Sequence, residues 1–246
     1  MQKLINNQII SYFKKAGDSS PTLVFLHGWR SEGRVFTQII NNIPKKTIYA
    51  LDLPGFSVSQ SFKDGATLGD YANLVNEFIK SENINEAILI GHSFGGRIAI
   101  KLASKNASWI KKIVLVDSAG LQEKNLKKFI YKIIAKIVKP FFYIPGLDSL
   151  RQTIYKKIGP DYLATPAMQK TFLNIINEDL EPLLKNINQE TLIVWGQDDD
   201  ITPISMAKTL KQNINNAKLE IIENAGHFCF IDQPQKFITI LNNFIN

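Results

Sequence analysis

The stretch "ILIGHSFGGRIAI", residues 88–100, decides the fold class of this chain. An apolar run leads into Gly91, Ser93 follows two residues later, and a second apolar run begins after Gly96. A sharp turn from a strand into a helix strains its central residue and crowds the flanking positions, so these positions must be small. The pattern predicts that Ser93 stands clear of a sheet at the start of a helix, where the backbone N–H of Phe94 can bind an oxyanion.

Short apolar runs alternate with helix-length segments along most of the chain. The runs lie at 22–28, 47–53, 86–92, 111–119, 190–196 and 217–226. They are continuous, as in parallel strands that are covered on both faces. The helix-length segments lie at 34–42, 67–81, 94–106, 203–214 and 233–245. This order predicts an α/β protein with a doubly wound, mostly parallel sheet, and residues 2–13 are expected to add antiparallel pairing at its edge.

Residues 121–185 interrupt the alternation of strands and helices. They show no strand pattern, and prolines break their helical pattern. Within 124–137, apolar residues recur at three- and four-residue spacing while lysines follow another face, which predicts an amphipathic helix. We expect a helical cap at 121–185, inserted after the sixth strand of the fold into a core formed by 1–120 and 186–246.

Composition restricts the cellular setting. The chain has 246 residues, and 45% of them are apolar, which suits one globular α/β domain. Cys229 is the only cysteine, so no internal disulfide can form. The N-terminal residues lack a secretory pattern, and no apolar run is long enough to span a membrane. A cytoplasmic location is therefore expected.

Charge and motif content restrict the partners. The formal net charge is +7, and nine Lys or Arg residues against two acids fall in 121–160. A basic segment alone predicts no nucleic-acid binding and at most a weak peripheral contact with an anionic membrane. No metal-binding spacing and no phosphate-binding loop is present, so neither a metal nor a cofactor is expected. The sequence leaves the oligomeric state open.

A serine hydroxyl attacks well only when a base takes its proton and a carboxylate orients the base. The Gly-x-Ser-x-Gly elbow is a mark of α/β-hydrolases, in which the serine, the acid and the histidine follow in that order. Of the three histidines, only His227 follows the last predicted strand, whereas His27 and His92 are expected to be structural. Three acids directly follow the strand predicted at 190–196, namely Asp198, Asp199 and Asp200.

The chain resembles the α/β-hydrolase family, in its lid-bearing group of serine esterases, from about residue 20 to 245. The resemblance rests on "FLHGW" (25–29), "DLPGFSVS" (52–59), "GHSFGG" (91–96), "WGQDDDITP" (195–203) and "AGHF" (225–228). In this family the acid lies three residues after the glycine of the "WG" strand end and four before the proline. This spacing implies Asp199, with Asp198 as the next candidate. The family's second oxyanion donor follows the "HG" pair, which implies the backbone N–H of Trp29.

The residues and the resemblance together predict a serine hydrolase enzyme that acts on a small-molecule ester without a cofactor. Its catalytic triad would be Ser93, Asp199 and His227, and its oxyanion hole the N–H groups of Trp29 and Phe94. Apolar residues of the cap favour small to medium apolar acyl groups. The expected pocket side chains are Trp29, Phe129, Phe141, Phe142 and Phe228. Two alternatives stay open: the same triad acting on a carbon–carbon bond, a lactone or an amide, and a hydrolase-fold ligand-binding protein with little turnover.

Overall fold

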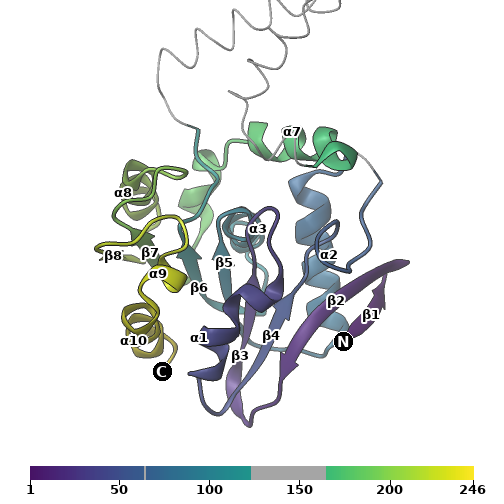
Figure 1. Ribbon diagram of the computed structural model, residues 1–246, viewed down its shortest axis with the longest axis horizontal. Helices are drawn as coiled ribbons and strands as arrows, with labels where there is room; N and C mark the ends of the chain where they lie inside the picture. The colour runs from purple at the N-terminus through teal and green to yellow at the C-terminus, as the bar shows by residue number, and fades with distance from the viewer. Residues whose placement is uncertain (64, 123–164) are drawn as a thin grey trace, which may run out of the picture.

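The computed structural model describes residues 1–63, 65–122 and 165–246, which form one eight-stranded sheet covered by helices (Figure 1). The strands are β1 (Gln2–Ile5), β2 (Gln8–Lys15), β3 (Ser19–Leu26), β4 (Lys46–Leu51), β5 (Ala87–His92), β6 (Ile110–Val116), β7 (Glu190–Gly196) and β8 (Ala217–Ile222). Their order across the sheet is β1-β2-β4-β3-β5-β6-β7-β8. The strands from β3 to β8 pair in parallel, and β1 and β2 form an antiparallel edge. The predicted doubly wound, mostly parallel sheet is confirmed.

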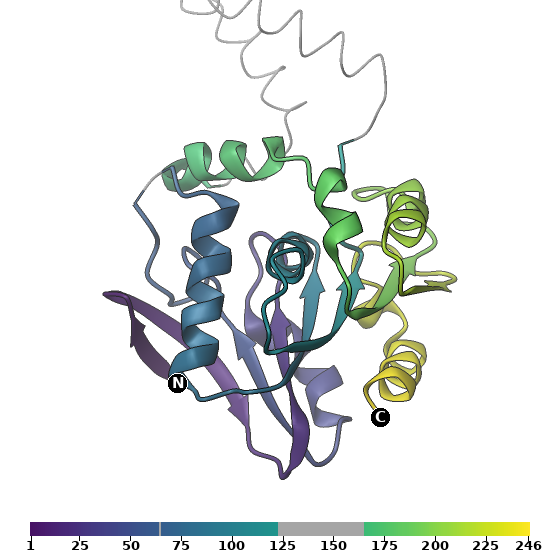
Figure 2. The ribbon, with the colours of Figure 1, turned by 180° about the vertical axis from the view of Figure 1, so that it is seen from behind.

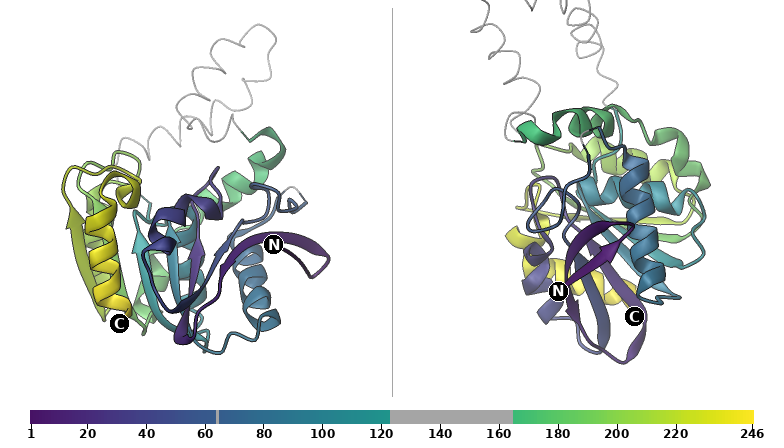
Figure 3. Two further views of the ribbon diagram at one scale, coloured as in Figure 1. Left: turned by 60° about the horizontal axis from the view of Figure 1, so that its bottom comes forward. Right: turned by 90° about the vertical axis from the view of Figure 1, so that its right-hand side faces the viewer.

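Helices cover both faces of the sheet (Figures 2 and 3). One face packs against α2 (Leu68–Ser81), α3 (Phe94–Ala103) and α8 (Ile204–Asn213), and the other against α1 (Thr37–Asn41) and α10 (Pro234–Ile245). Successive side chains of a strand point to opposite faces, so Val24 joins the first core while Phe25 joins the second. Burial on both faces explains why the strands are continuous apolar runs.

Two helix predictions differ from the structure. The helix predicted at 34–42 is a 3₁₀ turn, η1 (Gly33–Phe36), followed by the five-residue α1. Proline disfavours a helical conformation in the residue before it, so the helix stops ahead of Pro44. The helix predicted at 233–245 is α10, and one further turn, α9 (Cys229–Asp232), precedes it.

The predicted helix at 67–81 is confirmed as α2, which begins at a capping box. The side chain of Thr67 accepts a hydrogen bond from the backbone N–H of Asp70, and the Asp70 carboxylate accepts one from the backbone N–H of Thr67 at 2.7 Å. This exchange satisfies two N–H groups that have no partner within the helix. The start of α2 is therefore encoded locally.

The long connection between β6 and β7 lies where the cap was predicted. Its described part contains η3 (Pro166–Met168), α7 (Gln169–Asn177) and η4 (Glu181–Asn186). Figure 1 shows α7 across the end of the sheet at which the parallel strands finish. The amphipathic helix predicted at 124–137 lies outside the described residues, and the division into a core and a cap at 121–185 stays a prediction.

An arginine of α3 links this connection to the helix that packs on the sheet. The Arg97 guanidinium is buried and donates to the carbonyl oxygens of Ile175 and Glu178 at the end of α7. Lys101, one turn further along α3, forms an ion pair with Glu178. The helix that follows Ser93 thus also holds α7 over the strand ends.

Candidate active site

Ser93 is the single residue between the end of β5 and the start of α3. Its backbone conformation is unfavourable for any residue with a side chain. Its φ is 51° and its ψ is −109°. A Cβ atom at Gly91 would overlap the carbonyl oxygen of Gly95, and one at Gly95 would overlap the carbonyl oxygen of Leu26 in β3. The flanking glycines therefore allow the helix to begin directly against the strands, and Ser93 is left partly exposed at the turn.

The start of α3 presents backbone N–H groups beside Ser93. The N–H of Gly95 donates to the carbonyl of His27 at 3.1 Å, and that of Gly96 donates to the carbonyl of Ser93 at 3.0 Å. Phe94 is the first residue of the helix, so its N–H has no acceptor within the helix. Its position next to the Ser93 hydroxyl suits a donor to an oxyanion.

The loop after β3 runs against this turn. A Cβ placed on Gly28 would lie 3.3 Å from the Cβ of Ser93. The loop is anchored by His27, whose Nδ1 lies 2.7 Å from the carbonyl oxygen of Gly28 and whose Nε2 accepts from the N–H of Leu53 at 2.9 Å. Burial lowers the pKa of His27 to about 4, so the ring stays neutral and keeps both contacts. Trp29, the next residue of the loop, therefore lies near Ser93.

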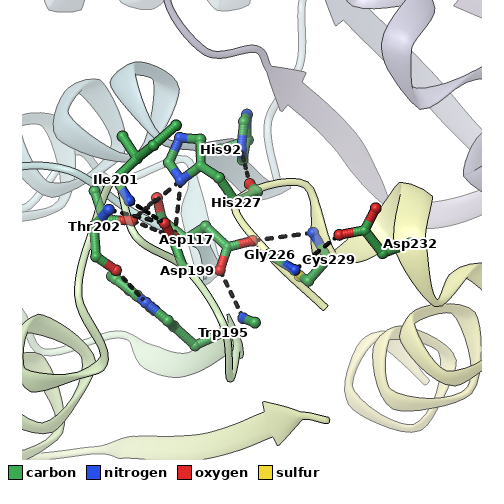
Figure 4. Close-up of polar contacts among 11 residues, drawn as sticks. His92, Asp117, Trp195, Asp199, Ile201, Thr202, Gly226, His227, Cys229 and Asp232 are labelled. Carbon is green, nitrogen blue, oxygen red and sulfur yellow. Dashed lines mark hydrogen bonds and ion pairs between the residues drawn. The ribbon is translucent and has the colours of Figure 1, made fainter. Parts of the chain in front are cut away.

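His227 lies in the loop between β8 and α9, and its ring contacts a carboxylate (Figure 4). The distance from His227 Nδ1 to Asp199 Oδ2 is 2.8 Å. The Asp199 side chain is 0% exposed and that of His227 is 8% exposed. A carboxylate at Nδ1 leaves Nε2 as the ring nitrogen that can accept a proton.

Asp199 is held by the loop that follows β7. Its Oδ1 accepts from the N–H groups of Ile201 and Thr202 at 2.8 and 2.9 Å, and its Oδ2 accepts from the Thr202 hydroxyl at 2.5 Å. Burial works against the charged form, but the hydrogen bonds from His227 and Thr202 hold the pKa of Asp199 below its ordinary value. Asp199 is thus an ionised, oriented carboxylate next to His227. Asp198 and Asp200 are exposed.

His92 connects the Ser93 turn to the His227 loop. Its Nε2 lies 2.8 Å from the carbonyl oxygen of His227, and the two imidazole rings lie 4.9 Å apart between their centroids. Because a carbonyl only accepts, His92 Nε2 carries the proton of this bond. Burial lowers the pKa of His92 to about 3, so the ring is neutral and its contact fits the predicted structural role.

The predicted pocket residues are only partly within the described chain. Phe228 is 36% exposed and its ring centroid lies 5.5 Å from that of His227. The Trp29 ring packs against Phe94 at 5.3 Å and against Phe172 of α7 at 5.1 Å. The remaining three predicted residues, Phe129, Phe141 and Phe142, lie outside the described residues.

Sequence reasoning missed three residues of this region. Phe172 belongs to α7 and packs on Trp29. Thr202 binds Asp199 and lies 3.2 Å from His227 Nδ1. Asp117, directly after β6, is 0% exposed and carries a buried carboxyl group. An acid at the end of an apolar strand, in "IVLVDSA", was the available signal for Asp117.

Within residues 1–63, 65–122 and 165–246, no group of three or more His, Cys, Asp or Glu side chains is placed to hold a metal ion. The helices of these same ranges include none with the length and hydropathy that crossing a bilayer requires.

Comparisons with known proteins extend over nearly the whole chain. A model of the alpha/beta hydrolase family matches residues 23–240. The AB hydrolase superfamily protein YisY of Bacillus subtilis (strain 168) is 27% identical over 255 residues, with 91% of each chain covered. A pimeloyl-(acyl-carrier protein) methyl ester esterase of Wigglesworthia glossinidia brevipalpis is 27% identical over 261 residues, covering 95% of this chain and 97% of the relative. The solved structure of an esterase from Exiguobacterium antarcticum superposes with a TM-score of 0.77 at 22% identity, covering 99% of this chain and 98% of that one.

Proposed function

The chain belongs to the alpha/beta hydrolase family of enzymes, and from this premise we propose that it hydrolyses carboxylic esters through Ser93, His227 and Asp199. The contact between His227 Nδ1 and Asp199 Oδ2 at 2.8 Å carries the proposal, because it leaves Nε2 as the proton acceptor. His92 precedes Ser93 and binds the carbonyl of His227, so the serine turn and the base loop meet at one edge of the sheet. A relative named as a methyl ester esterase supports an ester as the substrate.

The mechanism has two half-reactions. His227 Nε2 takes the proton of the Ser93 hydroxyl while Oγ attacks the ester carbonyl carbon, and the N–H groups of Trp29 and Phe94 bind the resulting oxyanion. The carbon–alkoxy bond then breaks, and His227 returns the proton to the leaving alcohol. A water molecule attacks the acyl-enzyme, again losing its proton to His227, and the carboxylic acid leaves as Ser93 recovers its proton.

Asp199 supports both half-reactions through charge and orientation. Its carboxylate stabilises the imidazolium that forms when His227 is protonated. We propose that the substrate is an ester with a small or medium apolar acyl group. The side chains of Trp29, Phe94 and Phe172, which pack together beside the turn, support an apolar wall at this place.

The first experiment tests the nucleophile. We expect a fluorophosphonate to label the wild-type protein at Ser93, identified by mass spectrometry of the modified peptide. Ser93→Ala should lose the label and lower kcat on p-nitrophenyl butyrate by about 10³-fold or more. Ser104→Ala is the matched control, because Ser104 lies at the other end of α3 and caps it through the carbonyl of Lys101. Full turnover by Ser93→Ala would refute the proposal.

The second experiment tests the bond and the acyl group. We expect kcat/KM to be highest for p-nitrophenyl acetate, butyrate or octanoate, and lower for the palmitate. A matching amide, a lactone and a vinylogous diketone acid should react more slowly than the best ester. Faster cleavage of any of these three would reassign the substrate while keeping the triad. Ligand binding without labelling or turnover would support a binding protein instead.

A further inference from the structure

Asp117 is a buried acid that the proposed mechanism does not use. It follows β6 directly, with a φ of 42°, and is 0% exposed. Its Oδ1 accepts from the N–H of Gly196 at 2.7 Å. Its Oδ2 accepts from the N–H of Cys229 at 3.3 Å (Figure 4). One carboxylate thus binds two backbone segments that are separated by more than thirty positions in the chain.

These two segments carry the acid and the base of the candidate site. Gly196 ends β7 and lies three residues before Asp199, whereas Cys229 begins α9 and lies two residues after His227. Because these separations along the chain are short, a shift of the Gly196 N–H moves Asp199, and a shift of the Cys229 N–H moves His227. The carboxylate of Asp117 lies between the segments in Figure 4 and contacts both of them.

The main chain of Asp117 extends the same link. Its N–H donates to the carbonyl of Val194 in β7 at 3.0 Å. Its carbonyl oxygen lies 3.2 Å from the hydroxyl of Thr202, which also contacts Asp199 at 2.5 Å and His227 Nδ1 at 3.2 Å.

Main-chain hydrogen bonds also join the two loops directly, such as the one from the Asp198 N–H to the carbonyl of Ala225 at 2.9 Å. Asp117 contributes the carboxylate that spans both segments.

We infer that Asp117 is a positioning residue, whose carboxylate sets the separation of Asp199 and His227 by binding the backbone of both loops. The inference rests on the proposed function, because it assigns the purpose of the link to proton transfer by His227. Asp117 contacts neither substrate nor reacting atoms in this scheme. Its effect is therefore on the rate of the chemical step and not on the binding of the ester.

The electrostatic surroundings make this link sensitive to protonation. Burial raises the pKa of Asp117 to about 7. The titratable groups that face its carboxylate are the Cys229 thiol of α9, which hydrogen-bonds to it, and the Asp199 carboxylate of the loop after β7. Burial also raises the pKa of the Cys229 thiol, which stays neutral. The ionised carboxylate accepts from both N–H groups, whereas its protonated form presents an O–H toward one of them.

The test compares two loop carboxylates. Asp117→Asn keeps the shape, but its amide NH₂ faces one of the two N–H donors, so one hydrogen bond is lost. Asp232→Asn is the matched control: Asp232 is exposed, and its carboxylate accepts from the N–H of Gly226 at 2.8 Å, which an amide oxygen also does. With p-nitrophenyl butyrate, we expect Asp117→Asn to lower kcat about 10- to 100-fold, with KM within twofold of the wild-type value. Asp232→Asn should retain kcat within twofold.

Two further readouts separate positioning from a general loss of structure. The rate of fluorophosphonate labelling at Ser93 should fall by the same factor as kcat in folded Asp117→Asn. In the wild-type protein, the amide proton resonances of Gly196 and Cys229 should shift together with pH, with one midpoint near 7. This NMR titration needs no variant, so it tests the link even if Asp117→Asn does not fold.

The outcomes distinguish the two proposals. If wild-type protein cleaves esters and Ser93→Ala does not, while folded Asp117→Asn keeps kcat within twofold, only the role of Asp117 is wrong. A rise in KM at constant kcat, or amide resonances with unrelated midpoints, would also overturn it. If wild-type protein neither turns over nor is labelled, the proposed function fails, and coincident titration of the two amides would then establish only a structural link.

Discussion

Ser93 and the His227–Asp199 pair both lie at the C-terminal ends of the parallel strands, but different parts of the chain position them. The turn at Ser93 is built from the contiguous segment 88–100, and its two flanking glycines lie within two residues of the serine. The proposed acid and base follow the ends of β7 and β8, and side chains from further loops hold them in place. The serine side is thus encoded locally, whereas the acid–base side exists only after β6, β7 and β8 have been placed next to one another.

The two sides also depend on different forces. The turn is held by close packing of backbone against backbone, with Gly95 against the carbonyl of Leu26. The acid–base side is held by hydrogen bonds to the buried carboxyl groups of Asp117 and Asp199. Added side-chain volume should therefore disrupt the first side, and a change of charge or pH the second. The predictions below test this contrast, from the largest expected effect to the smallest.

The largest effect tests whether the two sides act as one unit. We expect His227→Ala to lower kcat on p-nitrophenyl butyrate by about 10³-fold or more, because Ser93 then lacks its base. The double variant with Ser93→Ala should be no slower than the slower single variant, since residues that act together are not additive. Kinetics of both single variants and the double variant, with circular dichroism as the fold control, check this. Losses that multiply in the double variant would show that the two residues act independently.

The next effect separates neighbouring acids. Asp199→Asn should lower kcat by about 10³- to 10⁴-fold, because an amide neither stabilises the imidazolium nor selects the ring proton at Nδ1. Asp198→Asn, at the adjacent exposed position, should keep kcat within twofold. Steady-state kinetics at one pH on both purified variants is the measurement. Equal losses in the two variants would contradict the assignment that the contact at 2.8 Å supports.

The pH dependence of stability tests the buried acid. The pKa of Asp117 is raised to about 7 from an ordinary 3.8, so the folded state keeps a proton that the unfolded state has released. This stabilisation is fully present below about pH 4 and is lost as pH rises through 7. The free energy of unfolding of wild type minus that of Asp117→Asn should therefore fall by about 4 kcal/mol between pH 4 and 8 and then level off. Urea titrations across this range measure it, and a difference independent of pH would contradict the raised pKa.

The smallest effect tests the packing of the turn. Gly95→Ala places a methyl group against the carbonyl of Leu26, so we expect a loss of about 2 kcal/mol in the free energy of unfolding. Gly69→Ala in α2 is the control, because its Cβ would have only an ordinary contact, at 3.4 Å, with the Thr67 hydroxyl. That variant should be neutral or more stable by up to about 1 kcal/mol, since alanine is the better helix former. Differential scanning calorimetry compares the two variants. Equal melting temperatures would mean that β3 and α3 move apart at this position without a loss of stability.

Much of the fold was predictable because its signals are periodic and local. Continuous apolar runs identified the parallel strands, and the capping residues Thr67 and Asp70 located the start of α2. The helix predicted at 34–42 is present in a different form, because its first turn is 3₁₀ and its α-helical part ends at Asn41, ahead of Pro44. Phe172 went unrecognised for another reason: it belongs to no local motif, and α7 contacts the site only through the course of a long connection. Asp117 had a local signal at the end of β6, but that signal could not show which backbone segments its carboxylate binds.

The amino-acid sequence by itself determined the turn at Ser93, since glycines two residues to either side are a steric requirement of that turn. It also limited the proposed base to His227 among three histidines and the proposed acid to a run of three aspartates. The family spacing pointed to Asp199 within that run. Only the tertiary structure showed the contact of Asp199 with His227, and the hydrogen bonds by which Asp117 and Thr202 hold the loops around it. The physical reason is range: the strained conformation of Ser93 and the close approach of Gly91 to Gly95 arise within five residues of chain, whereas a hydrogen bond between strand ends requires that the sheet has first brought those ends together.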